Sequence, residues 1–117
     1  MNLFALVKAG VPQLGTNPVR FFEFGTAPTL TTPPYATWQE LLGTPLNFLE
    51  GNPSTDSVKV QIDAWAASAA ECRALARSIR RALDQHGTFT FYQNAWDEES
   101  RLYRSILHYN YNKGIDL

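Results

Sequence analysis

Residues 56–87 constrain the fold more than any other stretch, because every local signal in them agrees. From Val58 to Trp65, apolar residues alternate with other residues, which is the period of a β-strand with one buried face. Ser68 and Glu71 then form a capping-box pattern. In this pattern the Ser68 hydroxyl accepts from the backbone N–H of Glu71, and the Glu71 carboxylate accepts from that of Ser68.

From Ser68 to Gln85 the spacing predicts a helix with one apolar stripe. The stripe consists of Cys72, Leu75, Ala76, Ile79, Ala82 and Leu83. Gly87 follows the helix and is expected at the left-handed position just beyond its end. We therefore expect this strand–helix unit to organise the core, with the remaining segments packed on it.

The other segments predict further strands, loops and one short N-terminal element. We expect strands over Val19–Phe24, Tyr35–Glu40, Thr88–Gln93 and Arg101–Asn112, loops over 43–53 and 97–100, and either a helix or a short strand over Leu3–Ala9, the helix being favoured. Thr26–Pro34 contains three prolines and four threonines. Because proline cannot donate to a strand ladder, we expect an extended arm there.

The last predicted strand, Arg101–Asn112, carries large apolar or aromatic groups on both faces. A single helix covers only one face of a sheet, so the other face is expected to meet either the N-terminal segment or another subunit. The predicted fold is α+β: a mainly antiparallel β-sheet with one long α-helix packed on one face and a possible short N-terminal helix. We expect one domain spanning residues 1–117.

Composition argues against several classes of function. The net charge of −1 argues against a protein that wraps nucleic acid, and no apolar run reaches the roughly 20 residues of a membrane span. One cysteine cannot form an internal disulfide, which fits a reducing compartment. Charged residues make up 18% of the chain, below the usual value of about 25%, so part of the surface is expected to be covered by partners.

No arrangement of residues predicts catalysis, a metal site or a cofactor. The chain lacks a phosphate-binding glycine loop and a G-x-S-x-G motif, and neither His86 nor His108 has a ligand at metal-binding spacing. Cys72 falls in the apolar stripe and is expected to be a buried structural thiol. Asp63 is unusual within a strand, and we expect it to pair with Arg104 or Arg101 across the sheet.

The helix carries four arginines opposite its apolar stripe: Arg73, Arg77, Arg80 and Arg81. Such a face is either solvated or meets acidic groups of a neighbouring subunit, since arginine suits bidentate pairing with carboxylates. Direct binding of nucleic acid is a third reading, which the net charge disfavours. The acidic turn Asp97, Glu98 and Glu99 is a candidate for the opposite side of a subunit contact.

Several segments become informative when they are taken together in this order: Phe24–Pro28, Pro33–Gln39, Gly43–Pro45, Leu49–Pro53, Val60–Ala66, Ala76–Leu83 and Asp97–Arg104. The most distinctive are the Pro-Pro-Tyr segment, the Gln-Ile-Asp strand and the Ala-x-x-Ile-Arg-x-Ala-Leu helix. From about Val19 onward, the chain resembles the small tail-completion (tail-terminator, tail-to-head joining) proteins of long-tailed bacteriophages and prophages.

The resemblance implies a structural virion protein, with no enzymatic activity, that forms a homohexameric ring on the head-proximal end of the tail. The ring would stop polymerisation of the tail tube and join tail to head. The implied partners are other copies of the chain, the major tail tube protein and the head–tail connector, or stopper, protein. Genomic DNA would pass through the lumen without sequence-specific binding. The protein would be found in the virion, and in the host cytoplasm during assembly.

A sixfold ring needs two different patches that meet, because its contacts are heterologous. The resemblance suggests the arginine face and the acidic turn as these two patches. It also suggests that the arm, through Pro28, Pro33, Pro34 and Tyr35, reaches a neighbouring subunit or the tube.

Two other functions remain open at this point. One is a head-side neck or connector protein. The other is a small module that binds a nucleic acid or ligand on its sheet; Tyr103, Tyr109 and Tyr111 supply aromatic rings for it, but Lys113 is the only basic residue after Arg104. An enzyme has no motif in its favour.

Overall fold

In the described residues, the fold consists of a mixed five-stranded β-sheet and two short helices. The computed structural model describes residues 2–16, 18–28, 30–41 and 57–112, so the loop predicted over 43–53 lies outside the described residues. The elements are α1 (Leu3–Gly10), the 3-10 turn η1 (Pro12–Leu14), β1 (Phe21–Glu23), β2 (Tyr35–Leu41), β3 (Ser57–Ala66), α3 (Ala69–Leu83), β4 (Gly87–Asp97) and β5 (Leu102–Asn112). Their positions agree with the predicted segments to within a few residues.

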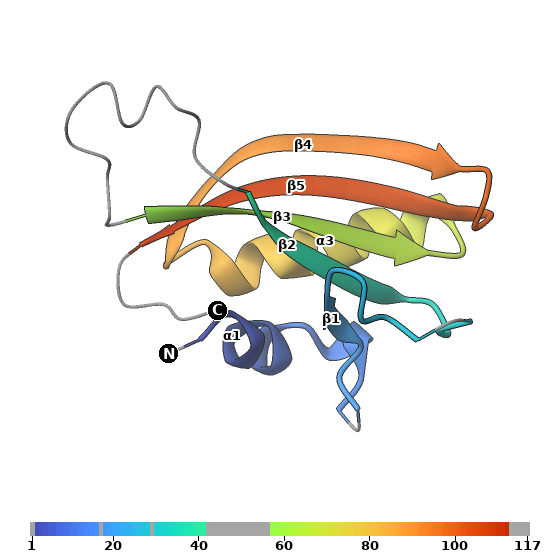
Figure 1. Ribbon diagram of the computed structural model, residues 1–117, viewed down its shortest axis with the longest axis horizontal. Helices are drawn as coiled ribbons and strands as arrows, with labels where there is room; N and C mark the ends of the chain where they lie inside the picture. Colours follow the sequence, from blue (N-terminus) through green and yellow to red (C-terminus); the bar gives the residue numbers. More distant parts are fainter. Residues whose placement is uncertain (1, 17, 29, 42–56, 113–117) are drawn as a thin grey trace.

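The sheet order is β1-β2-β3-β5-β4, which places β3 and β5 near its centre (Figure 1). β1 runs parallel to β2, and all other neighbouring strands are antiparallel. Val60 lies opposite Tyr109, and Ile62 lies opposite Leu107. Opposite residues of an antiparallel pair share a face, so these four buried side chains form one apolar surface.

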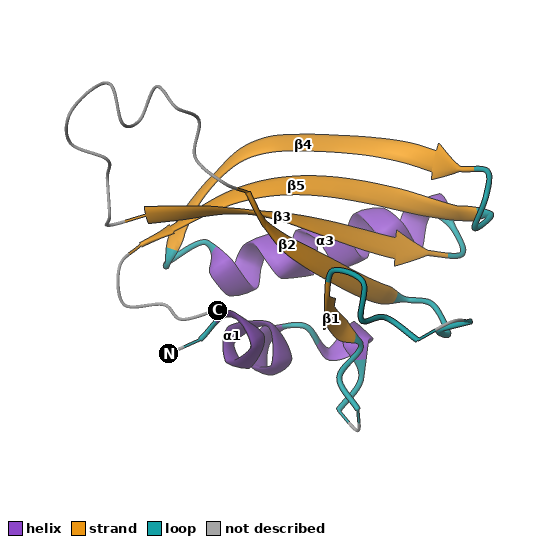
Figure 2. Cartoon of the chain, viewed as in Figure 1, coloured by secondary structure: helices purple, strands orange, loops and turns teal. Residues whose placement is uncertain are grey.

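Two helices cover that surface together (Figure 2). α3 packs against β3 and β5, while α1 packs against α3 and β1. The helices approach so closely at Gly10 that a Cβ there would lie 2.6 Å from the Cβ of Ala82. The core cluster comprises Leu3, Leu6, Val7, Val11, Leu14, Val19, Phe21, Ala36, Val60, Ile62, Ala64, Leu75, Ala76, Ile79, Leu83, Leu107 and Tyr109.

The fold predicted from the sequence is wrong in two respects. The helical layer is not one long helix: it consists of an 8-residue and a 15-residue helix, because α1 packs on the same side of the sheet as α3. The sheet is mixed, because the chain crosses back through residues 24–34 and so brings β1 alongside β2 in the same direction, while the other neighbouring strands are antiparallel. In the described residues, the N-terminal segment therefore leaves the opposite sheet face open.

The start of α3 agrees with the sequence, and its end does not. Ser68 is the N-cap, and its side chain accepts from the backbone N–H of Glu71 at 3.1 Å. The helix ends at Leu83, and Gly87 is the first residue of β4 with no left-handed conformation. Glycine is needed there because a Cβ would meet the carbonyl oxygen of Asn110 and the ring of Tyr109.

Tyr109 joins the end of α3 to the centre of the sheet. Its ring is fully buried against Phe89, with 4.7 Å between the ring centroids, and its hydroxyl donates to the carbonyl oxygen of Leu83 at 2.8 Å. Burial first, and the nearby Asp84 carboxylate second, raise the pKa of Tyr109 to about 12. The phenol therefore stays protonated and able to donate.

No helix in the described ranges is both long and apolar enough to span a membrane.

Substitution of the α3 cap tests whether the strand–helix unit carries the stability of the fold. Ser68→Ala removes the acceptor for the Glu71 N–H, and we expect it to lower the free energy of unfolding by about 1 kcal/mol. Ser68→Asp supplies another capping oxygen and should retain most of the stability. Urea unfolding followed by circular dichroism measures both variants. Equal midpoints for Ser68→Ala and the wild type would contradict the assignment.

Candidate functional site: an exposed strand edge beside an arginine groove

β4 is an outer strand of the sheet with an exposed aromatic surface. In the described part of the chain it pairs only with β5, and its 11 residues contain neither proline nor any charge before Asp97. Phe91, Tyr92 and Trp96 are 42%, 45% and 44% exposed. Soluble proteins usually protect long outer strands with lysines, prolines or short strand lengths, and of such features β4 has only a bulge between Phe89 and Phe91. Such an edge is typical of an interaction surface.

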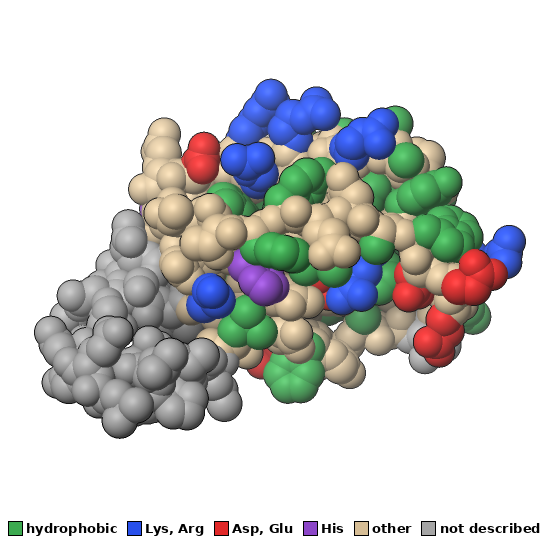
Figure 3. Space-filling model, turned by 90° about the horizontal axis from the view of Figure 1, so that it is seen from above, with side chains coloured by type: hydrophobic (Ala, Val, Ile, Leu, Met, Phe, Trp, Pro, Cys, Tyr) green, Lys and Arg blue, Asp and Glu red, His purple; other side chains and the backbone are tan. Residues whose placement is uncertain are grey.

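A groove with three arginines lies between this strand and α3. Tyr92 lies opposite the buried Leu107, so its side chain is on the helix side of the sheet. The groove has a volume of about 220 Å³ and is lined by Arg73, Ala76, Arg77, Arg80 and Tyr92. We call it the arginine groove. Figure 3 shows Lys and Arg side chains gathered along one margin of the molecule, with hydrophobic side chains next to them.

The arginines of the groove have no carboxylate partner among the described residues. The ion pairs in the described part of the chain join Arg101 to Glu98 and Arg104 to Asp63, and both lie outside the groove. Arg80 instead holds its guanidinium carbon 5.7 Å from the centre of the Phe89 ring, within the range of a cation–π contact. Arg81, the fourth predicted residue, is exposed but does not line the groove. The structure thus brings three of the four predicted arginines together in one groove, where no described carboxylate neutralises their positive charge.

The acidic turn lies at the end of the β4–β5 hairpin and has a fixed conformation (Figure 1). An Asp97 carboxylate oxygen accepts from the backbone N–H of Ser100 at 2.9 Å, and its carbonyl oxygen accepts from that of Arg101 at 2.8 Å. Hydrogen bonds from Ser100 lower the pKa of Asp97. Glu98 accepts from the Trp96 indole at 2.8 Å, and the exposed Glu99 extends into solvent. Within one copy, no ion pair joins this turn to the arginine groove in the described residues.

The base of the proline-rich arm belongs to the body of the protein. Arg20 donates to the carbonyl oxygens of Pro34 at 2.8 Å and Gln13 at 3.0 Å. Tyr35 is the first residue of β2, where its ring stacks on that of Trp65 with 6.0 Å between centroids. Both rings lie on the sheet face away from the helices. Pro34 and Tyr35 are therefore held in place by the body of the protein.

The outer part of the arm presents an apolar side chain to solvent. Pro28 is exposed, Pro33 is partly buried, and Leu30 is 95% exposed with a φ of 63°. A branched side chain in the left-handed region is strained, which makes an exposed leucine there unusual. The arm is thus a fixed base that carries an exposed apolar tip.

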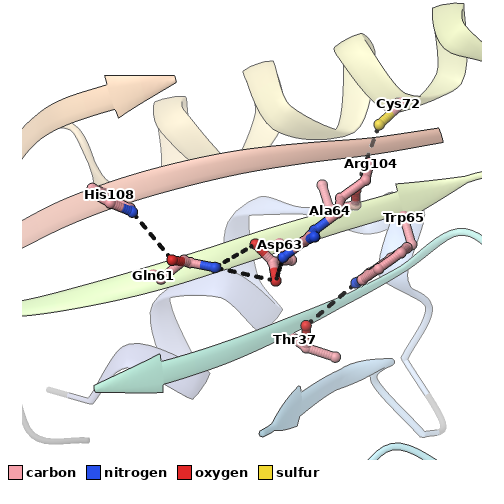
Figure 4. Close-up of polar contacts among 8 residues, drawn as sticks. All are labelled: Thr37, Gln61, Asp63, Ala64, Trp65, Cys72, Arg104 and His108. Atoms are coloured by element: carbon pink, nitrogen blue, oxygen red, sulfur yellow. Dashed lines mark hydrogen bonds and ion pairs between the residues drawn. The ribbon is translucent and has the colours of Figure 1, made fainter. Parts of the chain in front are cut away.

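The open sheet face carries a polar network that is paired within the chain (Figure 4). Arg104 donates to Asp63 at 2.9 Å, which confirms the predicted cross-strand pair, and Gln61 donates to the same carboxylate at 3.1 Å. The amide oxygen of Gln61 lies 3.1 Å from the Nε2 of His108. Arg104 also lies over the Trp65 ring, 5.1 Å from its centroid. These partners account for the charged residues at the centre of this face.

Cys72 is a buried structural thiol, as predicted. Its sulfur lies 3.5 Å from the carbonyl oxygen of Ala64 and 3.2 Å from the hydroxyl of Ser105. Burial raises the pKa of Cys72, which keeps it in the unreactive thiol form. Among the described residues, no three His, Cys, Asp or Glu side chains are placed so that they could hold a metal ion.

Sequence reasoning missed two residues of these surfaces, Tyr92 and Leu30. The alternation along β4 predicts a strand, but only the sheet order shows that β4 is an outer strand with exposed rings. One signal was available in the sequence, since residues 87–96 contain no charged residue. For Leu30, the signal was a single large apolar residue within a segment of threonines and prolines.

The chain matches the family model described as tail completion protein gp17 over residues 5–111. It belongs to the tail completion protein family. The match covers nearly all of the described residues, including β4, the arginine groove and the arm. A comparison with curated protein sequences found no match.

Among solved structures, a chain from the "Virion of native gene transfer agent (GTA) particle" has a similar fold. The TM-score is 0.68 at 12% sequence identity, and the alignment covers 95% of this chain and 90% of that chain. At this identity the likeness shows the fold alone. Membership of the tail completion family makes the protein a structural component of a phage tail and so of the virion.

The environment of His108 on the open sheet face predicts that the stability of this tail completion protein depends on pH. Burial first, and the Lys59 ammonium second, lower the pKa of His108, while Asp63 opposes them. The unfolded chain then binds a proton more readily than the folded one, so stability falls as the pH drops below the ordinary value of about 6.5. His108→Gln should flatten the dependence of the urea midpoint between about pH 7 and pH 5. Parallel curves for variant and wild type would contradict this assignment.

Proposed function

We propose that this tail completion protein forms a ring, of six copies, that caps the head-proximal end of the tail tube. The ring stops addition of tube subunits and presents its other side to the head connector. It acts by shape and contact, without catalysis or a cofactor, and DNA passes through its lumen. The family match is the observation that carries this proposal.

Two surfaces support a function in assembly. The edge of β4 and the arginine groove together offer exposed aromatic rings and unpaired guanidinium groups, which are the residue types that are enriched at protein interfaces. The arm offers a second, separate contact. Several different patches on one small chain fit a protein that must bind its own copies, the tube and the connector.

Deletion of the gene tests the capping function. In the phage or prophage that encodes it, we expect overlong tails, tails without heads and filled heads without tails in negative-stain images of lysates. A plasmid copy of the wild-type gene should restore complete virions. Normal virions after deletion would overturn the proposal.

The size of the assembly is tested on purified protein. Light scattering should give the mass of six copies, and negative-stain images should show rings. Because assembly of the ring can require the end of a tube, both measurements are repeated with tubes added. Tubes decorated at one end then indicate capping. A monomer that leaves both tube ends bare would contradict the ring.

We propose that the tip of the arm contacts a neighbouring subunit or the tube. Leu30→Asn replaces the exposed leucine with a polar residue that tolerates the left-handed backbone, so the variant should be at least as stable as the wild type. It should nevertheless yield at least tenfold fewer complete virions when it complements the deletion. Thr32→Asn, on an exposed neighbour, is the matched control. Equal yields for both variants and the wild type would show that the tip makes no contact.

A further inference from the structure

We propose that the acidic turn Asp97–Glu99 of one copy binds in the arginine groove of the next copy. The inference rests on the proposed ring, and it names the contact by which the ring closes. It also sorts the candidate residues: Arg73, Arg77 and Arg80 form the receiving site, while Arg81 takes no part.

The groove has the chemistry of a carboxylate site. Three arginines line a space of about 220 Å³, enough for one or two acidic side chains, and no described carboxylate of the same chain pairs with them. Arginine presents donors in a planar fork that matches a carboxylate. The half-exposed Tyr92 ring adds an apolar wall against which the aliphatic part of a glutamate can pack. A carboxylate ligand would also relieve the repulsion between Arg73 and Arg77, which are four residues apart on α3.

The turn has the properties of a matching ligand. It carries three consecutive acidic residues at the tip of a hairpin. Its backbone is held by the bonds of Asp97 to Ser100 and Arg101, and the indole of Trp96 orients Glu98. A ligand that is already ordered loses little conformational entropy on binding. Glu99 is exposed and has no hydrogen bond or ion pair among the described residues. We therefore expect its side chain to reach furthest into the arginine groove.

The positions of groove and turn favour contact between copies. The groove lies on the flank formed by α3 and β4, whereas the turn lies at the end of the β4–β5 hairpin. Two different patches that meet make a heterologous contact, which generates a ring when the rotation closes. The same contact would bring the neighbouring copy over the helix side of β4, where Tyr92 and Trp96 are exposed.

Charge reversal gives a test with an internal control. Arg77→Glu with Arg80→Glu makes the groove acidic, and Glu98→Lys with Glu99→Lys makes the turn basic. Each double variant alone would place like charges at every contact, so each is expected to lose the ring. In an equimolar mixture, each groove meets a turn of opposite charge, so rings with alternating copies should return. A chain with all four substitutions should also assemble by itself.

The measurements are light scattering and negative-stain imaging, with circular dichroism to confirm that each variant is folded. Arg81→Glu is the matched control, because it reverses an arginine on the same helix outside the groove and should leave the rings intact. Rings formed by the groove variant alone would overturn the proposal. So would a mixture in which both variants are folded and no rings return; this result would assign the groove to DNA phosphates or to an acidic segment of another protein.

A cross-linking experiment locates the contact independently of ring stability. Arg73→Cys with Glu99→Cys places one thiol at the groove and one on the turn, while the native Cys72 is buried. With a short bismaleimide, the double variant should give a ladder of linked copies, and each single variant should give none. Absence of a ladder while rings are visible would overturn the groove contact and leave the ring standing. Absence of rings and ladder in the variant, together with bare tubes for the wild-type protein, would overturn the ring itself.

Discussion

The burial of one face of β3 and β5 beneath the helices is the interaction on which the rest of the structure depends. Val60, Ile62, Leu107 and Tyr109 are fully buried there, and each large apolar side chain removed from water contributes about 1.5–3 kcal/mol. The ten-residue pairing of β3 with β5 sets the register that places these side chains on one side. A shift by one residue would turn all of them to the opposite face.

This central layer also decides which surfaces are left exposed. α3 packs against β3 and β5, which leaves the side chains of β4 beside the helix instead of beneath it. The rings of Tyr92 and Trp96 are thus on the core side of the sheet yet half exposed. Arg73, Arg77 and Arg80 of α3 face the same flank, and the groove between helix and strand results from this offset.

The two faces of the sheet meet different requirements. The helical face is mostly apolar and buried, whereas the open face holds Gln61, Asp63, Arg104 and His108 in one hydrogen-bonded chain. The Asp63 carboxylate, the Gln61 amide and one guanidinium nitrogen of Arg104 bond within the chain, while Arg104 Nε is buried without a hydrogen-bond partner among the described residues. The arginines without a carboxylate partner among the described residues lie instead along the helix–strand flank, where the proposed contact between copies needs them.

The sequence alone could predict the segments whose signals are local. The alternation of β3, the Ser68 cap and the apolar stripe of α3 act between residues a few positions apart, and each appears in the structure. A charge within a strand needs a cross-strand partner, which predicted that Asp63 pairs with Arg104 or Arg101, and the structure selects Arg104. The family resemblance rested on the same kind of local segments, and the family match agrees with it.

Only the tertiary structure decided how the elements share the core. That α1 joins α3 on one face, that β1 runs parallel to β2, and that Gly87 makes room for Tyr109 all depend on residues far apart in the chain. The same holds for the arginine groove, since periodicity puts Arg73, Arg77 and Arg80 on one side of a helix but does not reveal the strand beside them. Local patterns specify what each segment becomes. Packing between distant segments, which local patterns do not encode, specifies which of their surfaces remain free.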